Sequence, residues 1–338
     1  MSVRMCQVQV PATSANLGAG FDSFGMAFEL FNRFEFRLIA PQQTGVPPQF
    51  TDAPDTLYPM EGASWHLNTR EQNILTQAMY YVWHHVWHRP LADFPALEVV
   101  LTTHIPPARG LGSSATALVA GLLACNTLLA PIYQETPLNM TELIAVACHL
   151  EGHPDNTTPA LLGKVCLCRT EETLSAATSS LALPHVHVVH LPWVSTWQCV
   201  LCIPENAETS TKASRAVLPT SYAREEVITT LRQASYIALG LALPCRTTLA
   251  QGLSTEVLHQ PYRTPSLPHW DTIKTWQSQW LQNTIGQVLS GSGPTVLWIG
   301  EGLAQDALHQ LQEHLNPFEV TVRPLEINTT GASVLTSH

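Results

Sequence analysis

Charged side chains are scarce in this sequence of 338 residues. Asp, Glu, Lys and Arg make up 12% of it, the formal net charge is −10, and only three of the 16 basic residues are lysines. The basic residues are scattered, whereas proteins that bind nucleic acid or anionic membranes cluster theirs. We therefore expect no nucleic acid and no membrane as the main partner. A small anionic ligand would need a local basic pocket.

Long apolar runs and targeting segments are also lacking. We find no run that approaches the roughly 20 apolar residues of a membrane span. Residues 1–10 do not carry the charged, apolar and small-residue blocks of a signal peptide. The sequence thus indicates a soluble, cytoplasmic protein.

Metal-ligating residue types are present, but not at the spacing of a metal site. The eight cysteines are dispersed and lie mostly in apolar segments, where Cys behaves as a small hydrophobic residue. Cys199 and Cys202 have C-x-x-C spacing, yet no second pair lies nearby. The run W-H-H-V-W-H at 83–88 falls late in an amphipathic helix, so we expect core aromatics and solvated histidines there.

The most informative stretch that is present is P-P-A-R-G-L-G-S-S-A at residues 106–115. It follows a strand-like run at 96–105 and opens into a small, apolar segment at 116–129 that predicts a buried helix. Gly110 and Gly112 permit close backbone approach, and Ser113 and Ser114 place hydroxyls at the first turn of the helix. Such a helix N-terminus attracts phosphate.

Three other interpretations of this loop are a Walker A loop, a dinucleotide-binding loop and a simple turn. A Walker A loop is excluded because it requires a lysine that the stretch lacks. Residues 110–115 fit the looser dinucleotide pattern G-x-G-x-x-A, although two prolines precede them and no βαβ unit opens the chain. A turn of small residues that only lets a helix pack closely remains open from the loop alone.

Four segments together resemble the GHMP small-molecule kinases, which include galactokinase, homoserine kinase, mevalonate kinase and phosphomevalonate kinase. They are V-P-A-T-S-A-N-L-G-A-G-F-D-S-F-G-M-A-F at 10–28, P-x-x-x-G-L-G-S-S-A at 106–115, E-G-H-P-D-N-T-T-P-A-L-L-G at 151–163 and L-S-G-S-G-P-T-V at 289–296. The first is similar to the signature of homoserine kinases in particular. All four occur in the family's order, so the resemblance covers essentially the whole chain.

Length and periodicity predict two α+β domains. A chain of 338 residues exceeds one usual hydrophobic core, and from about residue 171 the composition changes to Thr, Ser and Ala, which we interpret as a linker. Alternating strands and helices favour antiparallel sheets with helices on one face. The resemblance implies an S5-like ATP-binding domain at 1–170 and a ferredoxin-like domain at 171–338, with the site between them.

Periodicity also places individual elements. Strands are expected at 5–10, 33–39, 96–105, 185–191, 197–203, 284–289, 295–299 and 318–324. Helices are expected at 72–87, 116–129, 139–151, 157–162, 222–243, 246–253, 270–282 and 303–315. We expect Pro11 to end the first strand and residues 41–65 to form a surface loop.

The resemblance implies ATP and Mg²⁺ as cofactors. The nucleotide-binding residues would be Asn73, Pro107, Arg109, Gly110, Leu111, Gly112, Ser113, Ser114 and Ala115. Only Asn73 carries over from a D-N-L-type family signature, because Gln72 stands before it. Magnesium needs one or two protein oxygens beside phosphate and water, and by family position these belong to Ser114 and Glu151.

The segment E-G-H-P-D-N also implies the catalytic residues, Asn156 and Asp155. Mevalonate-kinase-like members have an Asp in place of Asn156 as a general base, but an amide cannot accept a proton at neutral pH. Asn156 would therefore position the substrate hydroxyl, and the proton would leave to the phosphate. His153 and Asp155 are assigned to substrate orientation, with a purely structural role as the alternative.

The substrate that the resemblance implies is L-homoserine, a zwitterion. Arg215 in R-A-V-L-P and Arg263 in H-x-P-Y-R would bind its carboxylate, and Asn16 and Asp22 would face its hydroxyl and ammonium groups. The alternatives are surface ion pairs for the arginines and turn caps for Asn16 and Asp22.

The implied activity is ATP-dependent phosphorylation of L-homoserine to O-phospho-L-homoserine, a step of threonine biosynthesis. One alternative is another GHMP alcohol kinase, such as a mevalonate-kinase-like enzyme, because Thr157, Thr158 and Lys164 depart from the homoserine kinase pattern V-A and G-G. A second is a non-catalytic ligand sensor on the same fold. A homodimer is left open.

Overall fold

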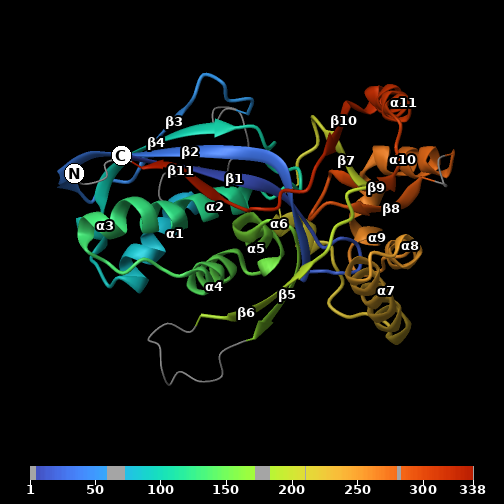
Figure 1. Cartoon of the computed structure of the whole chain (residues 1–338), viewed down its shortest axis with the longest axis horizontal. Helices are drawn as coiled ribbons and strands as arrows, with labels where there is room; N and C mark the ends of the chain where they lie inside the picture. The colour runs from blue at the N-terminus through green and yellow to red at the C-terminus, as the bar shows by residue number, and fades with distance from the viewer. Residues whose placement is uncertain (1–4, 59–72, 172–182, 210, 280–282, 338) are drawn as a thin grey trace.

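The structure is a computed structural model that describes residues 5–58, 73–171, 183–209, 211–279 and 283–337. Its strands form two sheets that lie side by side along the long axis of the molecule (Figure 1).

The first sheet has seven strands, in the order β11-β1-β2-β4-β3, with β5 paired to both β2 and β6. All its pairs are antiparallel except β3 with β4. The strands are β1 (Met5–Ala15), β2 (Phe24–Thr44), β3 (Gln49–Asp52), β4 (Pro95–Thr103), β5 (Val165–Glu171), β6 (His185–Leu191) and β11 (Ser333–Ser337).

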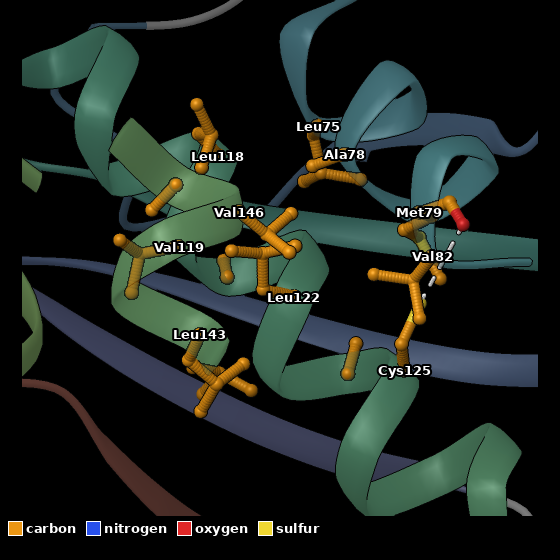
Figure 2. Packing of buried hydrophobic residues seen from close by; sticks show 14 of the residues in the cluster. Leu75, Ala78, Met79, Val82, Leu118, Val119, Leu122, Cys125, Leu143 and Val146 are labelled. Carbon is orange, nitrogen blue, oxygen red and sulfur yellow. Dashed lines mark hydrogen bonds between the residues drawn. The ribbon is translucent and has the colours of Figure 1, made fainter. Parts of the chain in front are cut away.

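Helices cover one face of this sheet, as expected (Figure 1). They are α1 (Ile74–Tyr81), α2 (Ser113–Ala124), α3 (Ala130–Tyr133), α4 (Met140–Glu151) and α5 (Pro154–Leu162), with π-helical turns at Val82–Val86 and Cys125–Leu129. Figure 2 shows how α1 and the π-helical turn after it pack against α2 and α4 through Leu75, Val82, Leu122 and Val146, all fully or almost fully buried. This core fixes the direction of α2, and so the place where its first turn points.

The second sheet is antiparallel, in the order β10-β7-β9-β8. Its strands are β7 (Trp197–Pro204), β8 (Thr284–Leu289), β9 (Val296–Glu301) and β10 (Val320–Leu325). Numbered within this half of the chain the order is 4-1-3-2, with helices between the first two and the last two strands. That is the ferredoxin-like arrangement that was expected.

Both faces of the second sheet are covered, which corrects the expectation of helices on one face only. Val200 and Trp298 pack against α10 (Pro268–Gln279) and α11 (Gln305–Leu315). Leu201 and Leu297, which point the opposite way, pack with α7 (Arg224–Ala242), α8 (Arg246–Leu253) and the end of the first sheet. Two shorter helices, α6 (Thr211–Ala216) and α9 (Gln260–Arg263), complete this half.

The first strand continues past Pro11, so the prediction that Pro11 ends it was wrong. β1 runs to Ala15 and pairs with β2 along its whole length, with a register irregularity between Pro11 and Ala12 that accommodates the missing N–H. The predicted loop at 41–65 is also partly ordered into strand, because β2 extends to Thr44 and β3 pairs with β4. Residues 59–65 of that prediction, and most of the expected linker at 172–182, lie outside the described residues.

One helical segment of the described chain, Ser113–Tyr133, is long and apolar enough to cross a membrane by length and composition, which corrects the expectation that no such run exists. Since 72% of its apolar window is buried inside the protein, it is the core helix of the first domain. The prediction that the cysteines act mostly as small hydrophobic residues is confirmed, because all of them except Cys245 are buried. Cys199 and Cys202 lie on opposite faces of β7.

The division at residue 170 stays a prediction. β6 and β11, which both follow that residue, lie in the first sheet.

Candidate active site

A pocket at the junction of the two sheets gathers residues from distant parts of the sequence. It is lined by the loop before α2, the start of α5, the β1–β2 turn, α6, Arg263 and the loop before β9. Among the predicted site residues it includes Asn16, Asp22, Arg109, Gly110, Leu111, Gly112, Ser113, Ser114, Glu151, His153, Asp155, Asn156, Arg215 and Arg263. The expectation of a site between the domains agrees with this geometry.

The glycine loop presents the N-terminus of α2 to the pocket. Gly112 is the N-cap residue, in the left-handed region with φ 67°, and no side chain caps the helix. A Cβ at Gly112 would lie 2.0 Å from Thr13 Oγ1, so only glycine fits. Ser113 Oγ is buried and has no hydrogen-bond partner among the described residues. Free N–H groups and an unpaired hydroxyl are what a bound phosphate would satisfy.

The loop before β9 holds the glycine loop from the second domain. Ser290 Oγ lies 2.7 Å from the Gly110 carbonyl oxygen and 2.9 Å from Ser14 Oγ, and the Gly291 N–H donates to the Ala15 carbonyl at 3.2 Å. A Cβ at Gly110 would lie 2.2 Å from the Ser290 carbonyl oxygen. Sequence reasoning placed the L-S-G-S-G-P segment in the family pattern without assigning Ser290 this contact.

Ser114 and Glu151 come together across the pocket. Both residues line it, and the Ser114 hydroxyl is near enough to the Glu151 carboxylate to affect its pKa. Desolvation raises the pKa of Glu151 above its ordinary value, while the nearby His153, Arg215 and Ser114 act in the opposite direction. A divalent cation would offset that desolvation, so this pair of oxygens fits a magnesium ligand set.

His153 and Asp155 form a buried pair at the start of α5. His153 Nδ1 lies 2.5 Å from Asp155 Oδ1, and the two residues are 8% and 1% exposed. Burial acts to lower the pKa of His153, but the bond to Asp155 and the charges of Asp155, Glu151 and Asp22 outweigh it and raise that pKa. His153 is therefore held as a cation-favouring group facing the pocket.

Asn156 is oriented by a residue that sequence reasoning missed. The hydroxyl of Thr13, a fully buried residue of β1, donates to Asn156 Oδ1 at 2.9 Å. The carboxamide oxygen is thereby occupied, which leaves the Asn156 NH₂ group to the pocket. From the sequence, Thr13 was noted only as part of the segment V-P-A-T-S-A-N-L and was given no role of its own.

Two arginines and an aspartate line another part of the pocket. Arg215 Nη2 lies 2.5 Å from Asp22 Oδ1, in an ion pair that joins the two domains. Arg263 is 7% exposed, and its guanidinium donates to the carbonyls of Ser214 and Gly291, each at 3.2 Å. Desolvation lowers the pKa of Arg263 from its ordinary value. Side chains of opposite charge thus line the same pocket as the glycine loop.

Comparison with known proteins agrees with this geometry. The family model for the N-terminal domain of GHMP kinases matches residues 73–164. The homoserine kinase of Microchaete diplosiphon is 34% identical over 332 residues, which cover 97% of this chain and 96% of that protein. The homoserine kinase of Nostoc punctiforme is 34% identical over 333 residues, which cover 96% of each.

The chain belongs to the homoserine kinase family. The resemblance found in the sequence is confirmed, and so is the GHMP kinase fold: a crystal structure of homoserine kinase from Cytophaga hutchinsonii superposes with a TM-score of 0.76 at 23% identity, covering 98% of this chain and 97% of that one. Mevalonate diphosphate decarboxylase from Staphylococcus aureus shares the fold with a TM-score of 0.64 at 13% identity. The fold alone therefore does not select a substrate.

Some residues that the homoserine kinase pattern assigned to ligands have structural contacts here. Asn16 Oδ1 accepts from the Asp22 N–H at 3.1 Å and its Nδ2 donates to the Gly291 carbonyl at 3.0 Å, so the carboxamide braces the β1–β2 turn. The Arg109 guanidinium donates to the carbonyls of Pro204 and Glu205 at the end of β7. Both residues still line the pocket.

Three predicted nucleotide-binding residues do not line the pocket. Asn73 is the N-cap of α1, and its side chain accepts from the Leu75 N–H at 2.8 Å. The Pro107 carbonyl accepts a bond from Arg109 at 3.2 Å, and Ala115 is fully buried inside α2. Their contact with ATP stays a prediction of the homoserine kinase pattern.

Proposed function

We propose that this protein transfers the γ-phosphoryl group of ATP to the hydroxyl of L-homoserine, giving O-phospho-L-homoserine and ADP. The observation that carries the proposal is the pocket itself. The free N-terminus of α2 and the Ser114–Glu151 pair lie in one cavity with Asp22, Arg215 and Arg263. Phosphoryl transfer needs positioning and charge neutralisation more than covalent chemistry from the protein.

Each group has a proposed role in that transfer. The phosphates of ATP lie on the loop 110–115, where the N–H groups of the first turn of α2 and the hydroxyl of Ser113 donate to them. The homoserine carboxylate binds to Arg215 and Arg263, and its ammonium group faces Asp22. The Asn156 NH₂ group holds the hydroxyl oxygen in line with the γ-phosphorus.

The transfer breaks the bond between the γ-phosphorus and its bridging oxygen as the homoserine oxygen forms the new one. Asn156 cannot accept the hydroxyl proton, and Asp155 already accepts from His153. The proton passes to an oxygen of the transferred phosphoryl group. Asp155, predicted as catalytic, takes a positioning role through His153.

We propose Ser114 and Glu151 as the residues that would hold Mg²⁺, which would supply positive charge to neutralise the phosphates. Ser114→Ala and Glu151→Gln should each lower turnover by well over tenfold, because the first removes an oxygen ligand and the second removes the negative charge that attracts the cation. A magnesium titration of both variants measures this, and unchanged magnesium dependence would remove the two residues from the metal site.

The substrate is tested at Arg215, whose side chain is 39% exposed and can be changed without opening the core. Arg215→Leu should raise the homoserine KM at least tenfold, consistent with the loss of a charged hydrogen bond worth roughly 1.5–3 kcal/mol, and leave the ATP KM nearly unchanged. Arg224→Leu, at the exposed start of α7, is the matched control. Equal homoserine KM in all three proteins would contradict the assignment.

A screen of acceptors decides between this reaction and other alcohol kinases of the fold. ADP release should follow homoserine and not mevalonate, galactose or threonine, and phosphorus NMR should identify the phosphate ester. ADP release with mevalonate alone would favour the mevalonate-kinase-like alternative. Binding of homoserine without any ADP release would favour a sensor.

We further propose a cytoplasmic protein of two domains, 1–170 and 171–338. The apolar segment Ser113–Tyr133 is consistent with that location because it lies mostly inside the first domain. The homodimer stays a prediction, which light scattering in solution would test.

A further inference from the structure

A cluster of two histidines and a glutamate lies on the β5–β6 ladder, outside the active-site pocket. Glu171 on β5 stands directly opposite His185 on β6, and His187 follows two residues later on the same face of the strand. The three residues are exposed or partly exposed. None of them lines the pocket described above.

The ligand atoms of this cluster already have the spacing of a metal site. His185 Nδ1 lies 3.0 Å from His187 Nε2, and His187 Nε2 lies 3.3 Å from Glu171 Oε2. The candidate atoms of all three residues lie within 4.8 Å of one another. In tetrahedral zinc sites the Zn–N and Zn–O distances are about 2.0–2.2 Å, which places neighbouring ligand atoms about 3.3 Å apart.

One neighbouring residue, Arg169, shares the carboxylate of this cluster. Arg169 Nη2 lies 2.5 Å from Glu171 Oε1, so it holds one carboxylate oxygen and leaves Oε2 to the histidines. The guanidinium also repels a cation, which limits the affinity. The side chains of His187 and Glu171 are 49% and 44% exposed, so water reaches the fourth position.

We propose that Glu171, His185 and His187 form a zinc site on the β5–β6 ladder, with water as the fourth ligand. Two imidazoles and a carboxylate are a donor set for zinc rather than for Mg²⁺, which prefers oxygen ligands. The site joins the end of β5 to the start of β6. Bound zinc would therefore hold the two strands together at the end where the chain passes from β5 to β6.

Calorimetric titration with Zn²⁺ tests the proposal, on full-length protein without a histidine tag and with excess Mg²⁺ present. Wild-type protein should bind one zinc ion that His187→Ala and His185→Ala bind at least tenfold more weakly. His309→Ala is the matched control, since His309 Nε2 lies 3.4 Å from Glu313 Oε1 and no three-ligand cluster of the described residues includes this pair. Its zinc affinity should equal that of the wild type.

A second measurement reports geometry instead of affinity. Co²⁺ in place of zinc should give the intense visible bands of a four-coordinate ion in wild-type protein and in His309→Ala, and lose them in His187→Ala. The proposal is overturned if wild-type protein binds no zinc, or if His187→Ala binds it equally well. It is also overturned if the binding is lost in Asp22→Asn instead, because the zinc would then lie at Asp22, His153 and Asp155 in the active-site pocket.

Discussion

The side chain of Asn156 is held by a neutral hydroxyl, and this contact indicates which role the amide has in the proposed reaction. Thr13 Oγ1 donates to Asn156 Oδ1 at 2.9 Å, and no cationic side chain is hydrogen-bonded to that oxygen in the described structure. An Asp at this position would have a hydroxyl beside it rather than a positive charge, so its pKa would not be tuned for base catalysis.

We predict that Thr13→Val lowers kcat by about tenfold, the value of one hydrogen bond, because the freed carboxamide can rotate. Thr13→Ser keeps the hydroxyl and should restore most of the rate. The measurement is steady-state kinetics with both substrates saturating. Full activity in Thr13→Val would mean that Asn156 is positioned by other contacts.

We also predict that Asn156→Ala damages turnover and that Asn156→Asp does not improve it. The pH–rate profile of the Asp variant is the test. A new limb, rising with an apparent pKa near that of a carboxylate, would show that the hydroxyl proton does pass to this residue.

The raised pKa of His153 depends on one bond. Asp155 Oδ1 lies 2.5 Å from His153 Nδ1, and the bond and charge of Asp155 are the largest influences that raise the pKa of the imidazole. A raised folded-state pKa means that the protonated form stabilises the fold below the ordinary histidine pKa, and that this contribution is lost as pH rises through the raised value.

We therefore predict that Asp155→Asn lowers the pKa of His153, because burial then dominates. NMR titration of the imidazole C–H signals would measure this, with exposed His309 as an internal reference. An unchanged His153 pKa would assign its shift to Glu151 and Asp22 instead.

At the scale of elements, the sequence predicts those features of a helix or strand that depend on residues close to each other in the chain. The helix at 139–151 was expected from its first-turn residues, and the structure shows a capping box between Asn139 and Glu142. The strands at 185–191 and 284–289 were predicted to the residue. The extension of β1 beyond Pro11 was not predictable, because it depends on hydrogen bonds to β2, a distant partner.

The site shows the same difference between features set by local sequence and features set by distant contacts. Motifs with fixed spacing predicted the loop, Glu151 and the arginines, and the pocket brings them together. Thr13 and Ser290 were missed because their roles arise from contacts across 143 and 180 positions of the sequence. Pairing of Arg215 with Asp22 likewise follows only from how the two domains meet.

Lys164 shows why a glycine is expected where α5 meets β5. It has φ 65°, in the left-handed region that costs a residue with a Cβ about 1–2 kcal/mol. Glycine removes that cost but loses about 0.4–1 kcal/mol through its freer unfolded chain.

We predict that Lys164→Gly raises the free energy of unfolding by about 0.5–1 kcal/mol, measured by chemical denaturation. Lys274→Gly, inside α10, is the contrasting control and should lower it by about 1 kcal/mol. Destabilisation by Lys164→Gly would mean that the lysine side chain makes contacts that outweigh its backbone strain.

At the scale of the whole molecule, the two halves share one hydrophobic cluster. Phe24, Met26 and Phe28 of the first sheet pack in the same cluster as Leu201 and Leu297 of the second. The first sheet also contains β6 and β11, from beyond residue 170. The halves should therefore depend on each other for stability.

We predict a single cooperative unfolding transition for the intact chain and no stable fold for the fragment 1–170. Calorimetry of the intact protein and circular dichroism of the fragment measure the two. A fragment that unfolds cooperatively on its own would show that the first sheet does not need β6 and β11.

The position of β11 beside β1 affects when the first sheet can form during synthesis of the chain. The strand that borders β1 consists of residues 333–337, so the first and last strands of the described chain lie side by side (Figure 1). A ribosome makes β1 long before β11, and domains generally fold as units during synthesis. The edge of β1 that pairs with β11 thus stays without that partner while the strands between them are made. The first sheet can be completed only once β11 has left the ribosome.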